Sequence, residues 1–132
     1  AGQIARAPIL AITGTNGKTT TTALLAHLCA AAGRTVHACG NLAADGGERL
    51  PLVEAAERAA PGDLLVAEVS SFQLEWTRAF RPRAAAWLNL SEDHGDAYPS
   101  REAYAADKAK LLRAQTPEDV AVLNADDPWV VR

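Results

Sequence analysis

The sequence predicts an α/β fold in which helices cover both faces of a mostly parallel sheet. Short continuous apolar runs, typical of strands buried on both faces, occur between segments with helical periodicity. A turn with glycines at positions 14 and 17 joins the first apolar run to the first helical segment. Strand, glycine-bearing turn and helix in this order are typical of phosphate-binding units. The sequence therefore favours a P-loop-type nucleotide-binding domain, as a single domain over residues 1–132.

The strands are predicted from the apolar runs, each ending where polar residues or glycine interrupt the run. They cover residues 7–13, 35–39, 64–69, 84–90 and 120–123. The polar segments 42–50 and 91–99 are predicted loops.

The helices are predicted from periodicity and from their start and stop signals. They cover residues 19–32, 51–60, 71–77 and 100–114. In the first helix Leu24, Leu25 and Leu28 lie on one side, and Gly33 supplies the C-terminal stop. The second ends before a Pro-Gly-Asp sequence. Ser100 is a suitable N-cap for the last helix.

A phosphate loop is predicted between the first strand and the first helix. Its residues are Gly14, Thr15, Asn16, Gly17, Lys18, Thr19 and Thr20. The glycines let backbone N–H groups approach an anion closely, and the helix dipole favours negative charge at the same point. Lys18 adds a positive charge for the outer phosphates, and the Thr19 hydroxyl can join a magnesium shell. Ile12 occupies the usual position of the first glycine, so this is a shortened phosphate loop.

Further polar residues end other predicted strands, at the sheet edge where parallel strands bind ligands. Asn41 follows the second strand, Glu68 lies in the third, and the segment 89–94 follows the fourth. A carboxylate inside an apolar strand is costly unless it is paired or binds a cation, so Glu68 is a candidate magnesium ligand. The alternative for Glu68 is a structural hydrogen bond. His94 is either a ligand at this edge or a solvated loop residue.

Composition argues against several other classes of protein. The net charge of −3 provides no basic face for nucleic acid. No apolar stretch approaches the roughly 20 residues of a membrane span, and the first residues do not form a signal peptide. Cys29 and Cys39 fit no metal spacing and are expected to be buried thiols, which favours a reducing, cytoplasmic setting. The sequence has no methionine, which favours a piece of a longer protein.

Four sequence blocks resemble the central ATPase domain of the Mur ligases, in the order typical of that family. They are TGTNGKTT at 13–20, EVSSFQLE at 68–75, NLSEDH at 89–94 and NADD at 124–127. Within the family, the SSFQLE segment is most similar to the branch that adds D-glutamate to UDP-N-acetylmuramoyl-L-alanine. The resemblance implies ATP-dependent peptide-bond formation. A substrate carboxylate takes the γ-phosphate to form an acyl phosphate, and an amine then displaces phosphate.

The resemblance also implies roles for individual residues, with ATP and Mg²⁺ as cofactors. The loop 15–20 would hold the β- and γ-phosphates, with Lys18 on the transferring group. Thr19 and Glu68 would bind one magnesium ion. The positions implied to contact the UDP-muramoyl substrate or a second magnesium ion are Asn41, Ser70, Gln73 and His94.

Lys108 is similar in position to the lysine that these ligases carbamylate. A free ammonium would repel magnesium, whereas an anionic carbamate can bind it. The catalytic residues that the resemblance implies are Lys18, His94 and Lys108. The alternative is that Lys108 and Lys110 are solvated helix residues.

Mur ligases also have an N-terminal domain that holds the UDP group and a C-terminal domain that brings the incoming amino acid. The sequence resembles neither, so we expect a partial central domain whose partners are the missing domains of a parent ligase and that does not turn over alone. One alternative is another Mur-type or folylpolyglutamate-type ligase, since the first block also suits the latter. The other is a non-catalytic nucleotide-binding module or folding fragment.

Overall fold

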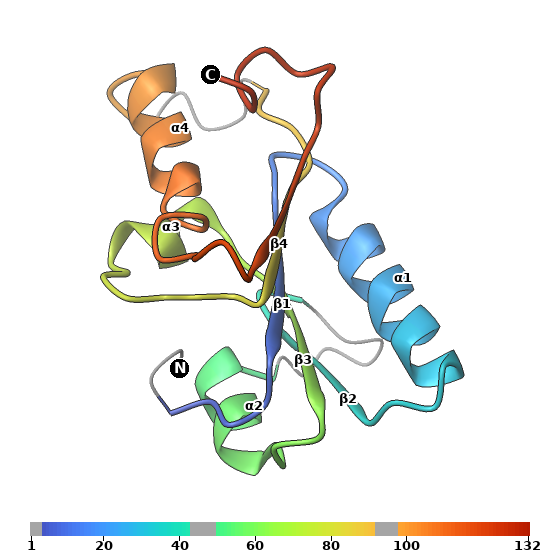
Figure 1. The fold of residues 1–132 in the computed structure, drawn as a ribbon. Coiled ribbons are helices and arrows are strands. Elements are labelled where there is room, and N and C mark those ends of the chain that lie inside the picture. Colours follow the sequence, from blue (N-terminus) through green and yellow to red (C-terminus); the bar gives the residue numbers. More distant parts are fainter. Residues whose placement is uncertain (1–3, 43–49, 92–97) are drawn as a thin grey trace.

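The computed structural model describes residues 4–42, 50–91 and 98–132, and it has the predicted α/β fold. Within these residues five strands form one parallel sheet in the order β2-β3-β1-β4-β5 (Figure 1). The strands are β1 (Ile9–Thr13), β2 (Val36–Gly40), β3 (Leu64–Glu68), β4 (Ala84–Trp87) and β5 (Val120–Leu123). All five were predicted, and the first strand of the chain lies at the centre of the sheet.

Helices cover the two faces of the sheet unequally (Figure 1). On one face α1 (Lys18–Ala31) contacts β1, β2 and β3. The other face carries α2 (Leu52–Arg58), α3 (Ser71–Glu75) and α4 (Arg101–Ala109). The main hydrophobic core lies on this second face and includes Ile9, Ala11, Ala55, Leu65, Ala67, Leu74 and Leu111. No helix in the described parts of the chain is long and apolar enough to span a membrane.

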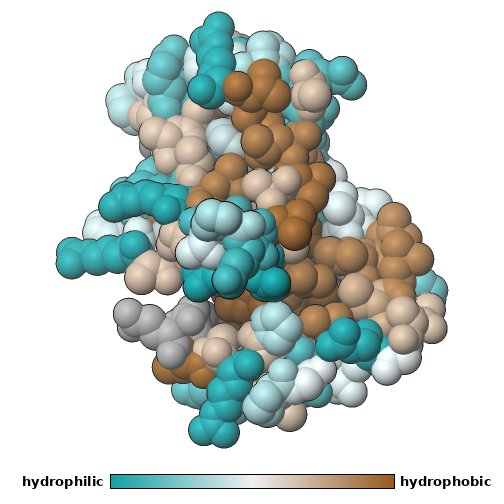
Figure 2. Space-filling model, viewed as in Figure 1, coloured by the Kyte–Doolittle hydropathy of each residue, from teal (hydrophilic) through white to brown (hydrophobic). Residues whose placement is uncertain are grey.

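Within the residues that the structure describes, no helix covers β4 and β5 on the face that carries α1. Strand register places Val120 and Val122 of β5 on the same face as Leu10 of β1. The side chains of Val120 and Val122 are 54% and 56% exposed. Leu24 and Leu28 of α1 are each 56% exposed, because this helix packs on the sheet through the fully buried Thr22 instead. Figure 2 shows apolar residues running together across this side of the molecule.

Two elements end at least three residues earlier than the sequence predicts. The strand predicted over 84–90 stops at Trp87, because the next residues turn to bind the loop after β1. The helix predicted over 100–114 stops at Ala109. There the backbone hydrogen bonds change to three-residue spacing, as in the 3.0 Å bond from the Leu111 N–H to the Lys108 carbonyl.

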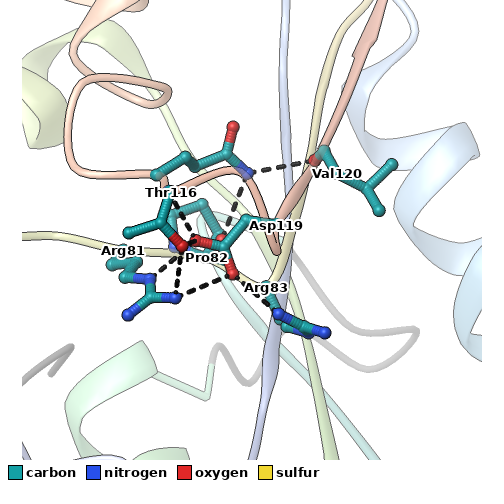
Figure 3. A network of polar contacts seen from close by, with 7 residues as sticks. Arg81, Pro82, Arg83, Thr116, Asp119 and Val120 are labelled. Carbon is teal, nitrogen blue, oxygen red and sulfur yellow. Dashed lines mark hydrogen bonds and ion pairs between the residues drawn. The ribbon is translucent and has the colours of Figure 1, made fainter.

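A polar network joins the starts of β4 and β5 (Figure 3). The Asp119 carboxylate, 1% exposed, lies 2.6 Å from Arg81 Nε and 3.2 Å from an Arg83 nitrogen. The hydrogen bond from Arg81 is the main cause that holds the pKa of Asp119 well below its usual range. This network fixes the amino ends of the two strands, which leaves their carboxyl ends to form the opposite edge of the sheet.

Candidate nucleotide-binding site

The turn after β1 leads into α1 without a side-chain cap at the start of the helix. Gly17 is the N-cap residue, with a φ of +80° that favours glycine. The first N–H groups of a helix have no acceptor within the helix, and together with the helix dipole they favour an anion. Lys18 Nζ lies over the turn, 2.8 Å from the carbonyl oxygen of Thr15. This geometry fits the predicted phosphate loop.

Glu68 lies beside this loop at the carboxyl end of β3 and is 2% exposed. Its Oε2 accepts a 2.8 Å hydrogen bond from the Thr19 hydroxyl, and its Oε1 accepts a 3.2 Å hydrogen bond from the Asn41 amide. The structure thus brings together three residues that the sequence selects separately. Both recorded partners of the carboxylate are neutral, which fits a group that a divalent cation would neutralise.

Asn41 reaches Glu68 because β2 and β3 approach closely at Gly40. Gly40 has a φ of +90°, and a Cβ atom there would lie 2.2 Å from the backbone oxygen of Glu68. The same oxygen accepts a 2.9 Å hydrogen bond from the Asn41 N–H. Glycine at this position therefore places Asn41 against the carboxylate.

The oxygen ligands around Glu68 suit Mg²⁺ that is shared with phosphate and water, rather than a metal ion bound by protein ligands alone. Among the described residues, no group of three or more His, Cys, Asp and Glu side chains could hold a metal ion. Mg²⁺ commonly takes one or two protein oxygens together with phosphate oxygens and water. The pair of Thr19 and Glu68, next to a phosphate loop, fits this requirement. His94, a predicted ligand, lies outside the described residues.

Lys108 of α4 is buried under the phosphate loop, with only 1% exposure. Its Nζ donates a 2.9 Å hydrogen bond to the Gly14 carbonyl and lies 4.7 Å from the centre of the Tyr104 ring. Burial, and to a smaller extent the charge of Lys18, lower the pKa of Lys108 to about 7. The alternative of a solvated Lys108 is therefore wrong. Its Nζ also lies 3.5 Å from the Thr13 hydroxyl at the end of β1. Its role as a metal-binding carbamate stays a prediction.

A pocket of about 760 Å³ opens beside Glu68, between the start of α2 and the end of α3. Asn41 and Gln73 contribute polar groups to its wall. The remaining lining is largely apolar and includes Leu52, Val53, Val69, Trp76 and Phe80. Its size is in the range of small-molecule sites, and it meets the carboxylate that fits a metal.

Ser70 and Gln73, both predicted to contact substrate, form a capping box at the start of α3. The Gln73 N–H donates to Ser70 Oγ at 3.3 Å, and the Ser70 N–H donates to Gln73 Oε1 at 2.9 Å. These bonds satisfy backbone groups that the helix itself leaves unpaired. The two residues thus have a structural role, while their contact with a substrate stays a prediction.

The residues after β4 form a second wall of the phosphate loop that the sequence analysis did not select. Asn89 binds the backbone of Thr15 and Asn16 through its side chain. The Ser91 N–H donates to the Thr15 hydroxyl at 3.0 Å. The signal available in the sequence was the position of Asn89 at the end of an apolar strand, in a segment from which only His94 was chosen.

Comparison with known proteins identifies relatives over almost the whole chain. The family model for the Mur ligase middle domain matches residues 12–132. The UDP-N-acetylmuramoylalanine--D-glutamate ligase of Pelobacter propionicus is 47% identical over 131 residues, which are 99% of this chain and 28% of that protein. The enzyme of the same name from Trichlorobacter lovleyi is 47% identical over 130 residues, with 98% and 28% covered. The chain thus spans about 28% of the length of these relatives.

Two solved structures of ligases have the same fold as this chain. A UDP-N-acetylmuramoyl-L-alanyl-D-glutamate--2,6-diaminopimelate ligase matches with a TM-score of 0.73 and 30% identity, over 95% of this chain and 28% of that one. MurF from Acinetobacter baumannii matches with a TM-score of 0.75 and 23% identity, over 98% and 28% of the two chains. The second match is a likeness of fold alone.

Proposed function

The chain belongs to the Mur ligase family, and from this premise we propose that it is the ATP-binding portion of a ligase that adds D-glutamate to UDP-N-acetylmuramoyl-L-alanine. The observation that carries the proposal is the buried Glu68 carboxylate, held by Thr19 of the phosphate loop and by Asn41 at the mouth of a pocket. The choice of D-glutamate is supported by the 47% identity to ligases of that name.

In this proposal the start of α1 and Lys18 hold the outer phosphates of ATP, and Thr19 and Glu68 hold Mg²⁺. Phosphoryl transfer depends mainly on positioning and on stabilisation of the developing negative charge. ATP supplies the phosphoryl group that activates the substrate carboxylate as an acyl phosphate, which the amine of D-glutamate then attacks. The chain's own residues orient the phosphates next to a cation.

The pocket between α2 and α3 is proposed to take part of the muramoyl substrate. Its polar wall lies next to Glu68, and its apolar part can bury carbon atoms of the ligand. Asn41 would then contact both the carboxylate that fits the metal and the substrate. Ser70 and Gln73 would contribute through α3, whose start they fix.

The chain would act together with further domains of a longer ligase, because it spans about 28% of the length of its relatives. Those domains would hold the UDP group and deliver D-glutamate. We place the reaction in the cytoplasm, where ATP is available, and the free Cys29 and Cys39 are compatible with a reducing compartment.

The test measures ADP release by the complete ligase in the presence of Mg²⁺. We expect release that requires both UDP-N-acetylmuramoyl-L-alanine and D-glutamate. Glu68→Gln keeps the shape of the side chain and removes its charge, so ADP release should fall at least ~100-fold, in line with the loss of a group that orients a catalytic metal. Thermal stability should hold or rise, since a buried carboxylate is costly without its cation.

Glu57→Gln is the matched control, because Glu57 is an exposed carboxylate on α2 and should retain full activity. Full activity in Glu68→Gln would contradict the proposed metal site. ADP release that requires a different amino acid would contradict the proposed substrate, and the absence of release with any substrate would favour a non-catalytic nucleotide-binding module.

A further inference from the structure

Asn89 makes an unusual set of contacts with the phosphate loop. It lies two residues beyond the end of β4. Its Oδ1 accepts hydrogen bonds from two consecutive backbone N–H groups, those of Thr15 and Asn16, each at 2.9 Å. Its Nδ2 donates to the Asn16 carbonyl at 3.1 Å. One side chain therefore fixes both the donors and an acceptor of the same short stretch of backbone.

The backbone around Asn89 is itself fixed by residues that follow β5. The Leu90 N–H donates to the Asp127 carboxylate at 2.7 Å, and Asn124 Nδ2 donates to the Leu88 carbonyl at 2.9 Å. The Trp87 indole donates to the Asn89 carbonyl at 3.2 Å. Asn89 is thus held from both sides, so it can act as a fixed support rather than move with the loop.

These contacts divide the backbone N–H groups of the loop into two sets. The N–H groups of Thr15 and Asn16 point toward Asn89 and are already bonded. The N–H groups at the start of α1 belong to a helix that no side chain caps. Asn16 and Gly17 are exposed. Without a support, the entropy cost of ordering this turn would be subtracted from the free energy of ligand binding.

We propose that Asn89 is a positioning residue that orders the phosphate loop before the nucleotide binds, so that the start of α1 meets the phosphates in a fixed arrangement. The proposal rests on the proposed function, in that the ligand of the loop is ATP. It predicts that Asn89 affects nucleotide affinity without touching the nucleotide.

The experiment measures the dissociation constant of Mg·ATP, the melting temperature and amide hydrogen exchange in the complete ligase and two variants. Asn89→Ala removes the support. Gln115→Ala is the matched control, because the Gln115 side-chain amide also bonds two backbone groups, the carbonyls of Pro82 and Val120, at the opposite end of the sheet. Asn89→Ser, which removes less of the side chain, replaces Asn89→Ala if the latter does not fold.

We expect both variants to lower the melting temperature and only Asn89→Ala to weaken ATP binding, by roughly 10-fold or more. Without nucleotide, the Asn16 amide should exchange slowly in the wild type and in Gln115→Ala, and rapidly in Asn89→Ala. The Thr15 amide should change less, because its N–H also donates at 3.1 Å to the Asn89 backbone carbonyl, which the substitution leaves in place. An Asn89→Ala protein with a lowered melting temperature but unchanged ATP affinity would overturn the inference. If the wild type binds no ATP, the proposed function fails, while unchanged exchange at the Asn16 amide would still overturn the role of Asn89.

Discussion

Lys108 is a lysine in surroundings that disfavour its charge. Burial of its side chain, and to a smaller extent the charge of Lys18, lower its pKa to about 7, although its Nζ donates a hydrogen bond to the Gly14 carbonyl. A substantial fraction of Lys108 is therefore neutral at physiological pH. Carbon dioxide adds only to a neutral amine, so this property favours the carbamylation that the family resemblance implies, which stays a prediction.

The depressed pKa of Lys108 makes the stability of the 132-residue chain depend on pH. Between about pH 7 and pH 9 the folded state releases the Lys108 proton, whereas the unfolded chain keeps it until its ordinary pKa of 10.5. The free energy of unfolding should therefore rise with pH, by at most ~1.4 kcal/mol per pH unit. Urea unfolding in buffers free of carbon dioxide measures this slope.

Lys108→Met should remove that slope, whereas Lys110→Met should keep it, because Lys110 is only partly buried and pairs with Asp107. The range ends near pH 9 because burial raises the pKa of Cys39 from its ordinary value of 9.0 to about 12, which opposes the trend at higher pH. An equal slope in wild type and Lys108→Met would show that Lys108 is not the group responsible.

The sequence singled out individual residues by their chemistry and their position. Glu68 was selected because a carboxylate in an apolar strand requires a reason, and Thr19 because it follows a glycine-bearing turn. The structure places their side chains 2.8 Å apart, and their role as metal ligands stays a prediction. Asn89 was missed, since an asparagine after a strand is also common in ordinary turns. The capping role of Ser70 was also missed, because the same Ser and Gln spacing fits both a helix start and a ligand contact.

At the scale of elements, the junction between β2 and β3 depends on a single glycine. Gly40→Ala would add a Cβ 2.2 Å from the Glu68 backbone oxygen at a φ of +90°, so strain and steric overlap act together. We expect a loss of at least ~3 kcal/mol in the free energy of unfolding. Denaturant unfolding of the isolated chain measures the loss.

Gly33→Ala separates the two effects in this experiment. Gly33 has a similar φ of +80°, but a Cβ there meets no atom within 4 Å. Its substitution should therefore cost only the strain, of about 1 kcal/mol. Equal losses in the two variants would contradict a close approach of the strands at Gly40.

The existence of the strands and helices, and their order along the chain, were predictable. Their ends were less predictable. Continuous apolar runs identify strands that are buried on both faces, which accounts for the success with β1 and β3. The end of β4 could not be predicted, because Leu88 to Leu90 leave the sheet to support the phosphate loop, where Thr15 lies 74 residues from Asn89 in sequence. The contacts that end this strand are therefore tertiary contacts, which a local sequence pattern does not contain.

At the scale of the whole molecule, the isolated chain exposes an apolar face and a strand edge together. Within the described residues β5 is an edge strand, and its Val120 and Val122 are exposed on the face of the sheet that carries α1. Figure 2 shows apolar residues running together across this side of the molecule. Such a combination favours pairing with another chain. We expect the 132-residue chain to self-associate at micromolar concentrations, which sedimentation velocity can measure.

Val122→Lys should make the isolated chain monomeric, because a charge on an edge strand opposes pairing. Val131→Lys is the matched control, since Val131 is similarly exposed at 52% but lies outside the strands, and this variant should still associate. A monomeric wild-type chain that unfolds cooperatively would contradict the expectation and indicate a self-contained domain.

The central position of β1 has a consequence for the order in which a ribosome can complete this fold. Among the strands of this sheet β1 is the first to be synthesised, yet its neighbours are β3 and β4, so Leu10 must wait for both Val66 and Ala84. Until then its apolar side chains and its backbone groups lack their final partners, which exposes a nascent chain to aggregation. The phosphate loop waits longer still, because its support at Asn89 emerges after β4. Nucleotide binding at full strength therefore requires that β4 and Asn89 have been synthesised, so nucleotide should stabilise mainly the nearly complete sheet.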